Sequence, residues 1–160
     1  MNTDKLLKIP FTWINKGQIL ELLPHKTNVR FALFCAHQVK HLIPKEHQEV
    51  CLKAIEVAEL FLVGKATKKE CGKAADAANA AAHAYAANAA YAAAYAANAS
   101  AAYASASYAA VNAAAHAYAS VSASNNQETL KQEQMDYLRD LIIAELPEEE
   151  KSCWLLVAAL

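Results

Sequence analysis

Residues 74–123 read AADAANAAAHAYAANAAYAAAYAANASAAYASASYAAVNAAAHAYASVSA, and more than half of them are alanine. Within this tract the octapeptide Asn-Ala-Ala-Ala-His-Ala-Tyr-Ala occurs twice, at Asn79–Ala86 and at Asn112–Ala119. In a helix, the Asn and His of each copy lie one turn apart on one face, and the Tyr points to nearly the opposite side. Each copy therefore offers a polar pair and an aromatic ring.

The tract is expected to form helix, because alanine is the strongest helix former and neither glycine nor proline occurs between Lys73 and Ser124. A single rod of this length would be about 75 Å long, which exceeds the size of a compact domain of this chain length. We therefore predict a fold-back at Asn98-Ala99-Ser100, since Asn tolerates left-handed geometry and Ser competes for backbone hydrogen bonds. The prediction is an antiparallel helical hairpin over residues 67–124.

Such a hairpin would bring His83 and His116 to the same level, since they are nearly equidistant from Ala99. Asn88, Tyr91, Tyr95 and Asn98 would form a second stripe at helical spacing along it. One interpretation is a polar network that fixes the register of an otherwise uniform alanine seam. The other is a pocket for a ligand or partner, whose candidate binding residues are Asn79, His83, Tyr85, Asn88, Tyr91, Tyr95, Asn112, His116 and Tyr118.

The rest of the chain predicts a single all-α domain, a compact helical bundle. Residues 1–27 are expected to be an irregular N-terminal segment, and residues 28–64 two core helices, the first capped by Asn28 and ended by Pro44. Gly64 should end the second helix, and Thr67 with Glu70 should form a capping box that starts the alanine tract. Residues 126–160 should form C-terminal helices.

Composition excludes several classes of function. The chain has 15 basic and 16 acidic residues, and no Lys or Arg between Lys73 and Lys131, which disfavours binding to nucleic acid. No apolar run is long enough to span a membrane, so we expect a cytoplasmic protein. The four cysteines lack metal or redox spacing and are expected to be small core residues.

No nucleophile elbow, phosphate-binding glycine loop or pair of catalytic carboxylates occurs, so we expect neither an enzyme, nor catalytic residues, nor a cofactor. Two groups of residues have a spacing that could hold a metal ion, but lone histidines on helix faces are commoner than metal ligands, and we expect no metal site. One combines Asp76, His83 and His116, and the other combines His37, His41, His47 and Cys51.

Three segments carry a family resemblance: RFALFCAHQVKHLIP at residues 30–44, the run from Lys53 to Ala86, and QMDYLRDLI at residues 134–142. They resemble an alanine-rich all-helical family that includes proposed immunity proteins of bacterial polymorphic toxin systems and uncharacterised bacterial and phage proteins. The likeness covers about Ile19 to Ile143. It implies an all-α inhibitor without catalytic residues.

Our first hypothesis is therefore a non-catalytic protein that neutralises a toxin or effector by direct binding. The alternative is a phage or bacterial sponge, an anti-defence protein that sequesters a small nucleotide-like signalling molecule in a pocket lined by Tyr, Asn and His. A homodimer is also expected, because the alanine faces and the segment Trp154–Val157 provide apolar surface for self-association.

Overall fold

The protein is described by a computed structural model over residues 3–6, 8–85, 88–101, 106–121, 124–148 and 150–151. Within these residues there are helices and no strands, which confirms the predicted all-α class. The elements are α1 (Thr3–Leu6), α2 (Lys16–Glu21), α3 (His25–Val39), η1 (Lys40–Leu42), η2 (Lys45–His47), α4 (Gln48–Leu62), α5 (Lys68–Tyr85), α6 (Asn88–Ala101), α7 (Ala106–Ala119) and α8 (Ser124–Glu145).

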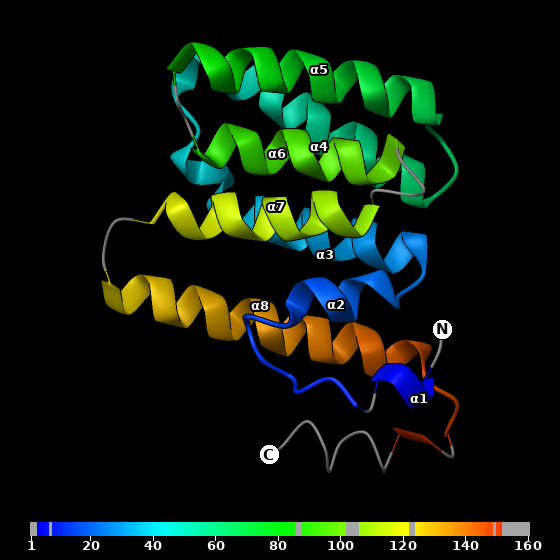
Figure 1. Cartoon of the computed structure of the whole chain (residues 1–160). Helices are drawn as coiled ribbons and strands as arrows, with labels where there is room; N and C mark the ends of the chain where they lie inside the picture. Colours follow the sequence, from blue (N-terminus) through cyan, green and yellow to red (C-terminus); the bar gives the residue numbers. More distant parts are fainter. Residues whose placement is uncertain are drawn as a thin grey trace.

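The helices form a compact bundle of two layers (Figure 1). Helices α5, α6, α7 and α8 lie side by side in the front layer of the figure, and each runs antiparallel to the one before it. Helices α3 and α4 lie behind them. Helix α6 is central, because it packs against α5 and α7 in its own layer and against α3 and α4 in the other.

The alanine tract does fold back on itself, a few residues after the predicted position, and it has one further break. Asn98, Ala99 and Ser100 still belong to the last turn of α6, which ends at Ala101, and the Ser100 hydroxyl donates to the carbonyl oxygen of Ala96 at 3.2 Å. A serine that bonds to the carbonyl four residues earlier stays compatible with helix instead of ending it. The tract forms three helices, and the junctions between them, at residues 86–87 and 102–105, lie outside the described residues.

Helix length explains why three helices fit better than two. Helices α6 and α7 have 14 residues each, and their partners α3 and α4 have 15 residues each, so all four are about 21 to 23 Å long. Two arms that each took half of the tract would project well beyond α3 and α4. Their outer turns would then leave alanine faces without a partner.

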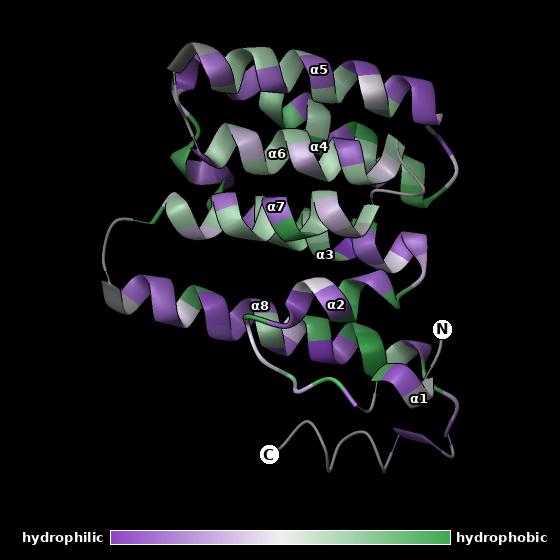
Figure 2. Ribbon diagram, in the orientation of Figure 1, coloured by the Kyte–Doolittle hydropathy of each residue, from purple (hydrophilic) through white to green (hydrophobic). Residues whose placement is uncertain are grey.

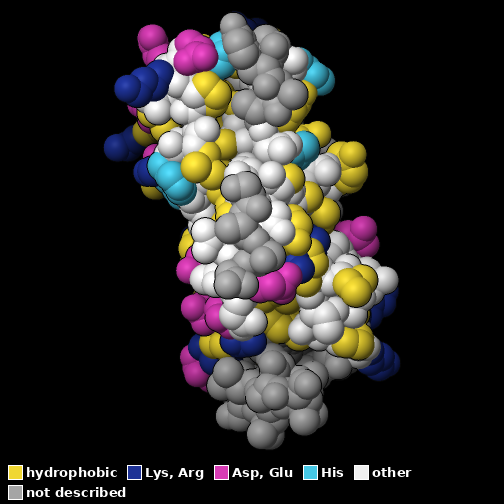
Figure 3. All heavy atoms as spheres, turned by 90° about the vertical axis from the view of Figure 1, so that its left-hand side faces the viewer, with side chains coloured by type: hydrophobic (Ala, Val, Ile, Leu, Met, Phe, Trp, Pro, Cys, Tyr) yellow, Lys and Arg dark blue, Asp and Glu magenta, His cyan; other side chains and the backbone are white. Residues whose placement is uncertain are grey.

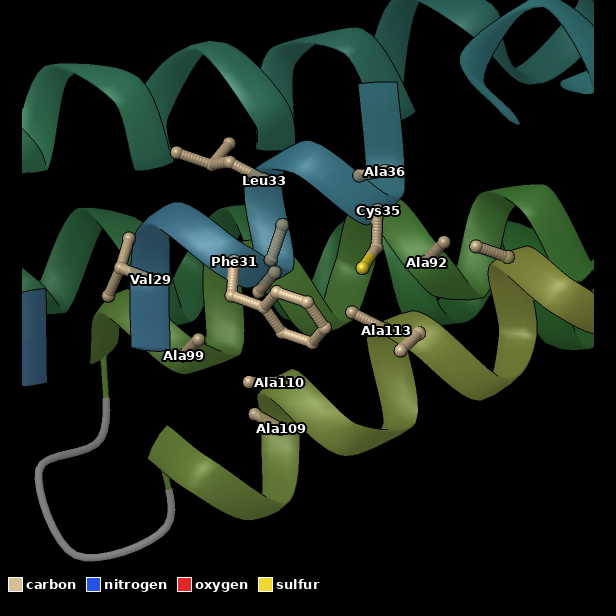
Figure 4. Close-up of a cluster of buried hydrophobic side chains, with 14 of the residues drawn as sticks. Val29, Phe31, Leu33, Cys35, Ala36, Ala92, Ala99, Ala109, Ala110 and Ala113 are labelled. Carbon is tan, nitrogen blue, oxygen red and sulfur yellow. The ribbon is translucent and has the colours of Figure 1, made fainter. Parts of the chain in front are cut away.

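The core joins large side chains of α3 to alanine methyl groups of α6 and α7. Phe31 is fully buried, and its ring lies among Ala99, Ala110 and Ala113 (Figure 4). Figure 2 shows the weak hydropathy of alanine along α6 and α7, interrupted by hydrophilic residues. Because alanine has no side chain beyond Cβ, the helices approach closely and the large residues of the opposite layer fill the space between them.

Local signals in the sequence had mixed outcomes. Thr67 and Glu70 form the predicted capping box: Thr67 N–H donates to Glu70 Oε2 at 2.7 Å, and Glu70 N–H donates to Thr67 Oγ1 at 3.3 Å. Gly64 follows the end of α4 with φ 74°, as expected of a helix stop. Asn28, in contrast, does not cap α3, because this helix begins at His25 after Pro24 and Asn28 is buried in its first turns.

The N-terminal segment is more regular than expected, since α1 and α2 both fall within residues 1–27. Cys35, Cys51 and Cys71 are buried free thiols, and Cys153 lies outside the described residues. Most of the expected last helix also lies outside the described residues. The same holds for the apolar segment Trp154–Val157, on which the expectation of a homodimer partly rests. None of the helices in the described part of the chain is long and apolar enough to cross a membrane.

Candidate functional site

The outer side of α6 carries a polar stripe made of Asn88, Tyr91, Tyr95 and Asn98, which we call the tyrosine stripe. These residues recur at intervals of three and four along a helix whose alanines are buried on the other sides. All four side chains are partly exposed. The stripe therefore belongs to the surface and not to the seam between two arms, where the sequence argument had placed it.

Two histidines from neighbouring helices meet the tyrosine stripe. His83 lies in the last turn of α5 and His116 in the last turn of α7, and both of these helices end on the same side of the bundle (Figure 1). The ring of Tyr91 contacts both imidazoles, with ring centroids 5.2 Å from His83 and 4.8 Å from His116. Tyr95 stacks on His116 at 5.4 Å with an interplanar angle of 12°. The twin histidines are thus joined through Tyr91.

Hydrogen bonds fix this arrangement. The Tyr91 hydroxyl and Nδ1 of His83 form a hydrogen bond at 2.7 Å. Nδ1–H of His116 donates to Oδ1 of Asn88 at 3.1 Å, and Nδ2 of Asn88 donates to the carbonyl oxygen of Ala119 at 3.4 Å. These five residues, His83, Asn88, Tyr91, Tyr95 and His116, form a continuous set that we call the histidine–tyrosine cluster.

The surroundings of the cluster carry no formal charge over a long stretch of chain. No Asp, Glu, Lys or Arg occurs between Asp76 and Glu128, so histidine is the residue type there that can gain a charge near neutral pH. Burial lowers the pKa of His116 below its usual value, and burial likewise raises the pKa of Tyr95. Both groups are therefore held in their neutral forms.

The end of the bundle seen in Figure 3 combines histidines with uncharged surface. There, histidine side chains are exposed in the upper half, and most acidic and basic side chains lie at the edges or in the lower half. Helices α3, α5 and α7 each have a histidine as the basic residue of the last turn: His37, His83 and His116.

Other predicted site residues lie apart from the cluster. The ring of Tyr118 lies 6.0 Å from that of Trp13, tilted by 45°, and under the ammonium group of Lys131, between the N-terminal segment and α8. Asn112 donates to the carbonyl oxygen of Tyr108 on its own helix at 3.1 Å. Asn79 is partly exposed one turn before His83 on α5, and the side chain of Tyr85 lies outside the described part.

Sequence reasoning missed a hollow next to the cluster. A pocket of about 360 Å³ opens where α3 and α7 end against α8. Its lining includes Gln38 of α3 and His41 of η1, together with Ser120 and Val121 after α7 and Glu133 of α8. No sequence signal could have found it, because these residues come from three separate segments and follow no motif.

The described residues contain no group of three or more His, Cys, Asp and Glu side chains that could hold a metal ion. The two metal sets weighed from the sequence are not assembled there. Cys51 is buried in α4, and His37 forms an ion pair with Glu59 at 2.8 Å. Of the first set, His83 and His116 are held by Tyr91 and Asn88.

The two-layer arrangement and the surface group of Tyr, Asn and His define a compact all-α protein with an uncharged polar surface at one end of its bundle. Residues 18–142 match the model of the family described as "Imm-5 like putative immunity protein". The chain therefore belongs to this family, which agrees with the resemblance carried by the three sequence segments. No curated protein and no solved structure is significantly similar to the chain.

Proposed function

We propose that this protein is an immunity protein that neutralises a bacterial toxin by binding to it directly and stoichiometrically. The family match over residues 18–142 carries the proposal. Family members of this kind act in general without catalysis, and inhibition by occlusion requires only a surface complementary to the toxin. As part of this proposal, we place the inhibition in the cytoplasm of the cell that the protein protects.

We place the toxin-binding surface on the histidine–tyrosine cluster and the remainder of the tyrosine stripe. Tyrosine is enriched in the energetic centres of protein interfaces, since it provides a large rigid contact area and a hydroxyl group at low cost in side-chain entropy. Asparagine adds hydrogen bonds of both directions. The interactions within the cluster hold Tyr91 and Tyr95 in fixed orientations before binding, which lowers the entropic cost of association.

The proposal is tested by co-expression with candidate toxins, taken from the products of the genes that flank its own gene. The wild-type protein should restore growth and should co-purify with the toxin in a fixed ratio. His83→Ala with Tyr91→Ala should weaken the complex by tenfold or more, because an interface centre of this kind contributes about 2 kcal/mol or more. Circular dichroism should show that the double variant keeps its helical content.

A matched control is available in His37→Ala. Like His83, His37 is a solvent-accessible histidine in the last turn of a helix, and its Nε2–H donates a hydrogen bond to Oε1 of Glu59 at 2.8 Å. This variant should protect cells as well as the wild type does. Unimpaired protection by the cluster variant would move the toxin contact to another surface, and failure of the wild type to bind the toxin would refute the function. Native mass spectrometry showing a retained nucleotide-like compound would favour sequestration instead.

A further inference from the structure

We propose that the pocket between α3, α7 and α8 binds the guanidinium or ammonium group of a small organic cation or of a basic side chain. The pocket volume of about 360 Å³ lies within the range of small-ligand sites and is ample for an arginine side chain. Apart from His41, Glu133 is the one ionisable residue among the described residues that line it.

The carboxylate of Glu133 is held in position by a chain of two amides. Gln38 Nε2 donates to Glu133 Oε2 at 2.8 Å, and Gln134 Nε2 donates to Gln38 Oε1 at 2.9 Å. Gln134 is fully buried in α8, so this chain is anchored in the core. Since Gln38 engages one oxygen of the carboxylate, the other oxygen can accept from a ligand. No Lys or Arg in the described residues is paired with Glu133 by an ion pair.

Helix ends of both signs meet at the pocket. Helix α7 ends at Ala119 and α3 is followed at once by η1, so the C-terminal ends of both helices favour a cation there, whereas the first turn of α8, which contributes Asn126, favours an anion. The full negative charge of Glu133 therefore decides the preference of the pocket for a cation. The hydroxyl of Ser120 and the side chain of Asn126, which also line the pocket, can accept hydrogen bonds from a planar guanidinium group.

The pocket adjoins the proposed toxin-binding surface. Ser120 stands directly after α7, one turn beyond His116, and its hydroxyl donates to the carbonyl oxygen of His116 at 2.7 Å. A toxin seated on the histidine–tyrosine cluster would therefore have the pocket at its edge. This part of the inference rests on the proposed function, whereas binding of a free cation does not.

The test is a titration of the whole chain with methylguanidinium chloride at constant ionic strength. Binding is monitored by two-dimensional NMR of the side-chain amides. We expect a saturable shift of the Gln38 amide signals, with a dissociation constant on the order of millimolar for so small a probe. Glu133→Gln should weaken binding about tenfold or more, because it replaces a charged acceptor by a neutral one. Asp140→Asn, which makes the same charge change at an exposed position of α8, should leave binding intact.

Two results would overturn the site: a linear, unsaturable response in the wild type, or equal affinity in Glu133→Gln and in the wild type. The source of the cation is then resolved in cells that express the toxin. If Glu133→Gln protects less well than Asp140→Asn, the cation is a basic side chain of the toxin. If both protect equally while NMR binding is lost in Glu133→Gln, the ligand is a free small cation. Loss of wild-type protection altogether would refute the immunity function and leave the NMR result standing.

Discussion

The replacement Phe31→Ala should be unusually destabilising, because of what surrounds the ring. Phe31 is fully buried, and the ring lies against alanines of α6 and α7 (Figure 4). When a buried phenylalanine is truncated, neighbouring side chains usually rotate into part of the cavity and recover some contacts. Alanine has no rotamers to change, and its Cβ moves only with the helix backbone.

The loss should therefore lie in the upper part of the usual range for this change, at about 4 to 5 kcal/mol of unfolding free energy. A single domain of this size has a total stability of about 5 to 15 kcal/mol, so the variant should be folded but close to its limit. Phe31→Leu, which keeps most of the volume, should lose about 1 to 1.5 kcal/mol. Urea unfolding followed by circular dichroism at 222 nm measures both.

Phe34 provides the control on the same helix. It is only partly buried and stacks on Tyr137 at a centroid distance of 4.1 Å, so Phe34→Ala should cost about 1 to 2 kcal/mol. A loss below about 2 kcal/mol in Phe31→Ala, or a loss equal to that in Phe34→Ala, would mean that the alanine helices can close the cavity. The idea of rigid alanine walls would then be wrong.

Three further predictions concern local elements. Thr67→Ala should lower the unfolding free energy by about 1 kcal/mol, because it removes the hydroxyl that caps the amide of Glu70, and urea unfolding measures the loss. Gly64→Ala should also destabilise the protein, by about 1 kcal/mol or more, because φ is 74° at this residue. Gly72→Ala inside α5 should instead stabilise the protein by about 0.5 to 1 kcal/mol, since alanine favours helix and the added Cβ would meet its nearest neighbour at 4.0 Å. Thermal melts of the two variants measure the difference. The stability contributed by neutral His116 should be present above pH 6.5 and should decline as the pH falls below that value. The reason is that the lowered pKa makes the folded protein bind this proton more weakly than the unfolded chain does. Unfolding free energies of the wild type and His116→Asn, measured across pH 5 to 8, should therefore converge toward low pH.

Each of these predictions has a result that contradicts it. Unchanged stability in Thr67→Ala would mean that water caps the helix as well as threonine does. Equal effects at the two glycines would refute the conformational argument, since only one of them has a positive φ. A stability difference between wild type and His116→Asn that does not vary with pH would show that protonation of this imidazole is not linked to folding.

The sequence was sufficient for the helices whose ends are marked by specific side chains. Thr67, Glu70 and Gly64 each have a local role that does not depend on the rest of the fold, and each is found in that role. The start of α3 was misjudged because Pro24 begins the helix and the nearby Asn28, a good capping residue in isolation, is buried instead.

The positions of the breaks in the alanine tract could not be predicted by the same reasoning. Alanine has the same helix propensity at every position, so local preference does not distinguish one break from another. The breaks depend on the lengths of α3 and α4, which are properties of the assembled bundle. Of the nine predicted binding residues, five form the cluster, because helical spacing groups them correctly, although they meet at the surface of α5, α6 and α7 and not in a seam between two arms. Tyr118 points elsewhere, since its contact with Trp13 comes from a segment for which no helix had been expected.

Helix α6 separates two tasks within a single 14-residue element. Its buried alanines determine how the layers fit, and the partly exposed tyrosine stripe connects α6 to the histidines of α5 and α7 at the surface. Under the proposed function, exchanging the four residues of the stripe would alter what the protein recognises, while the buried alanines keep the arrangement of the layers. A scaffold with this property can generate a repertoire of specificities, and so can follow an adversary that keeps changing its own surface.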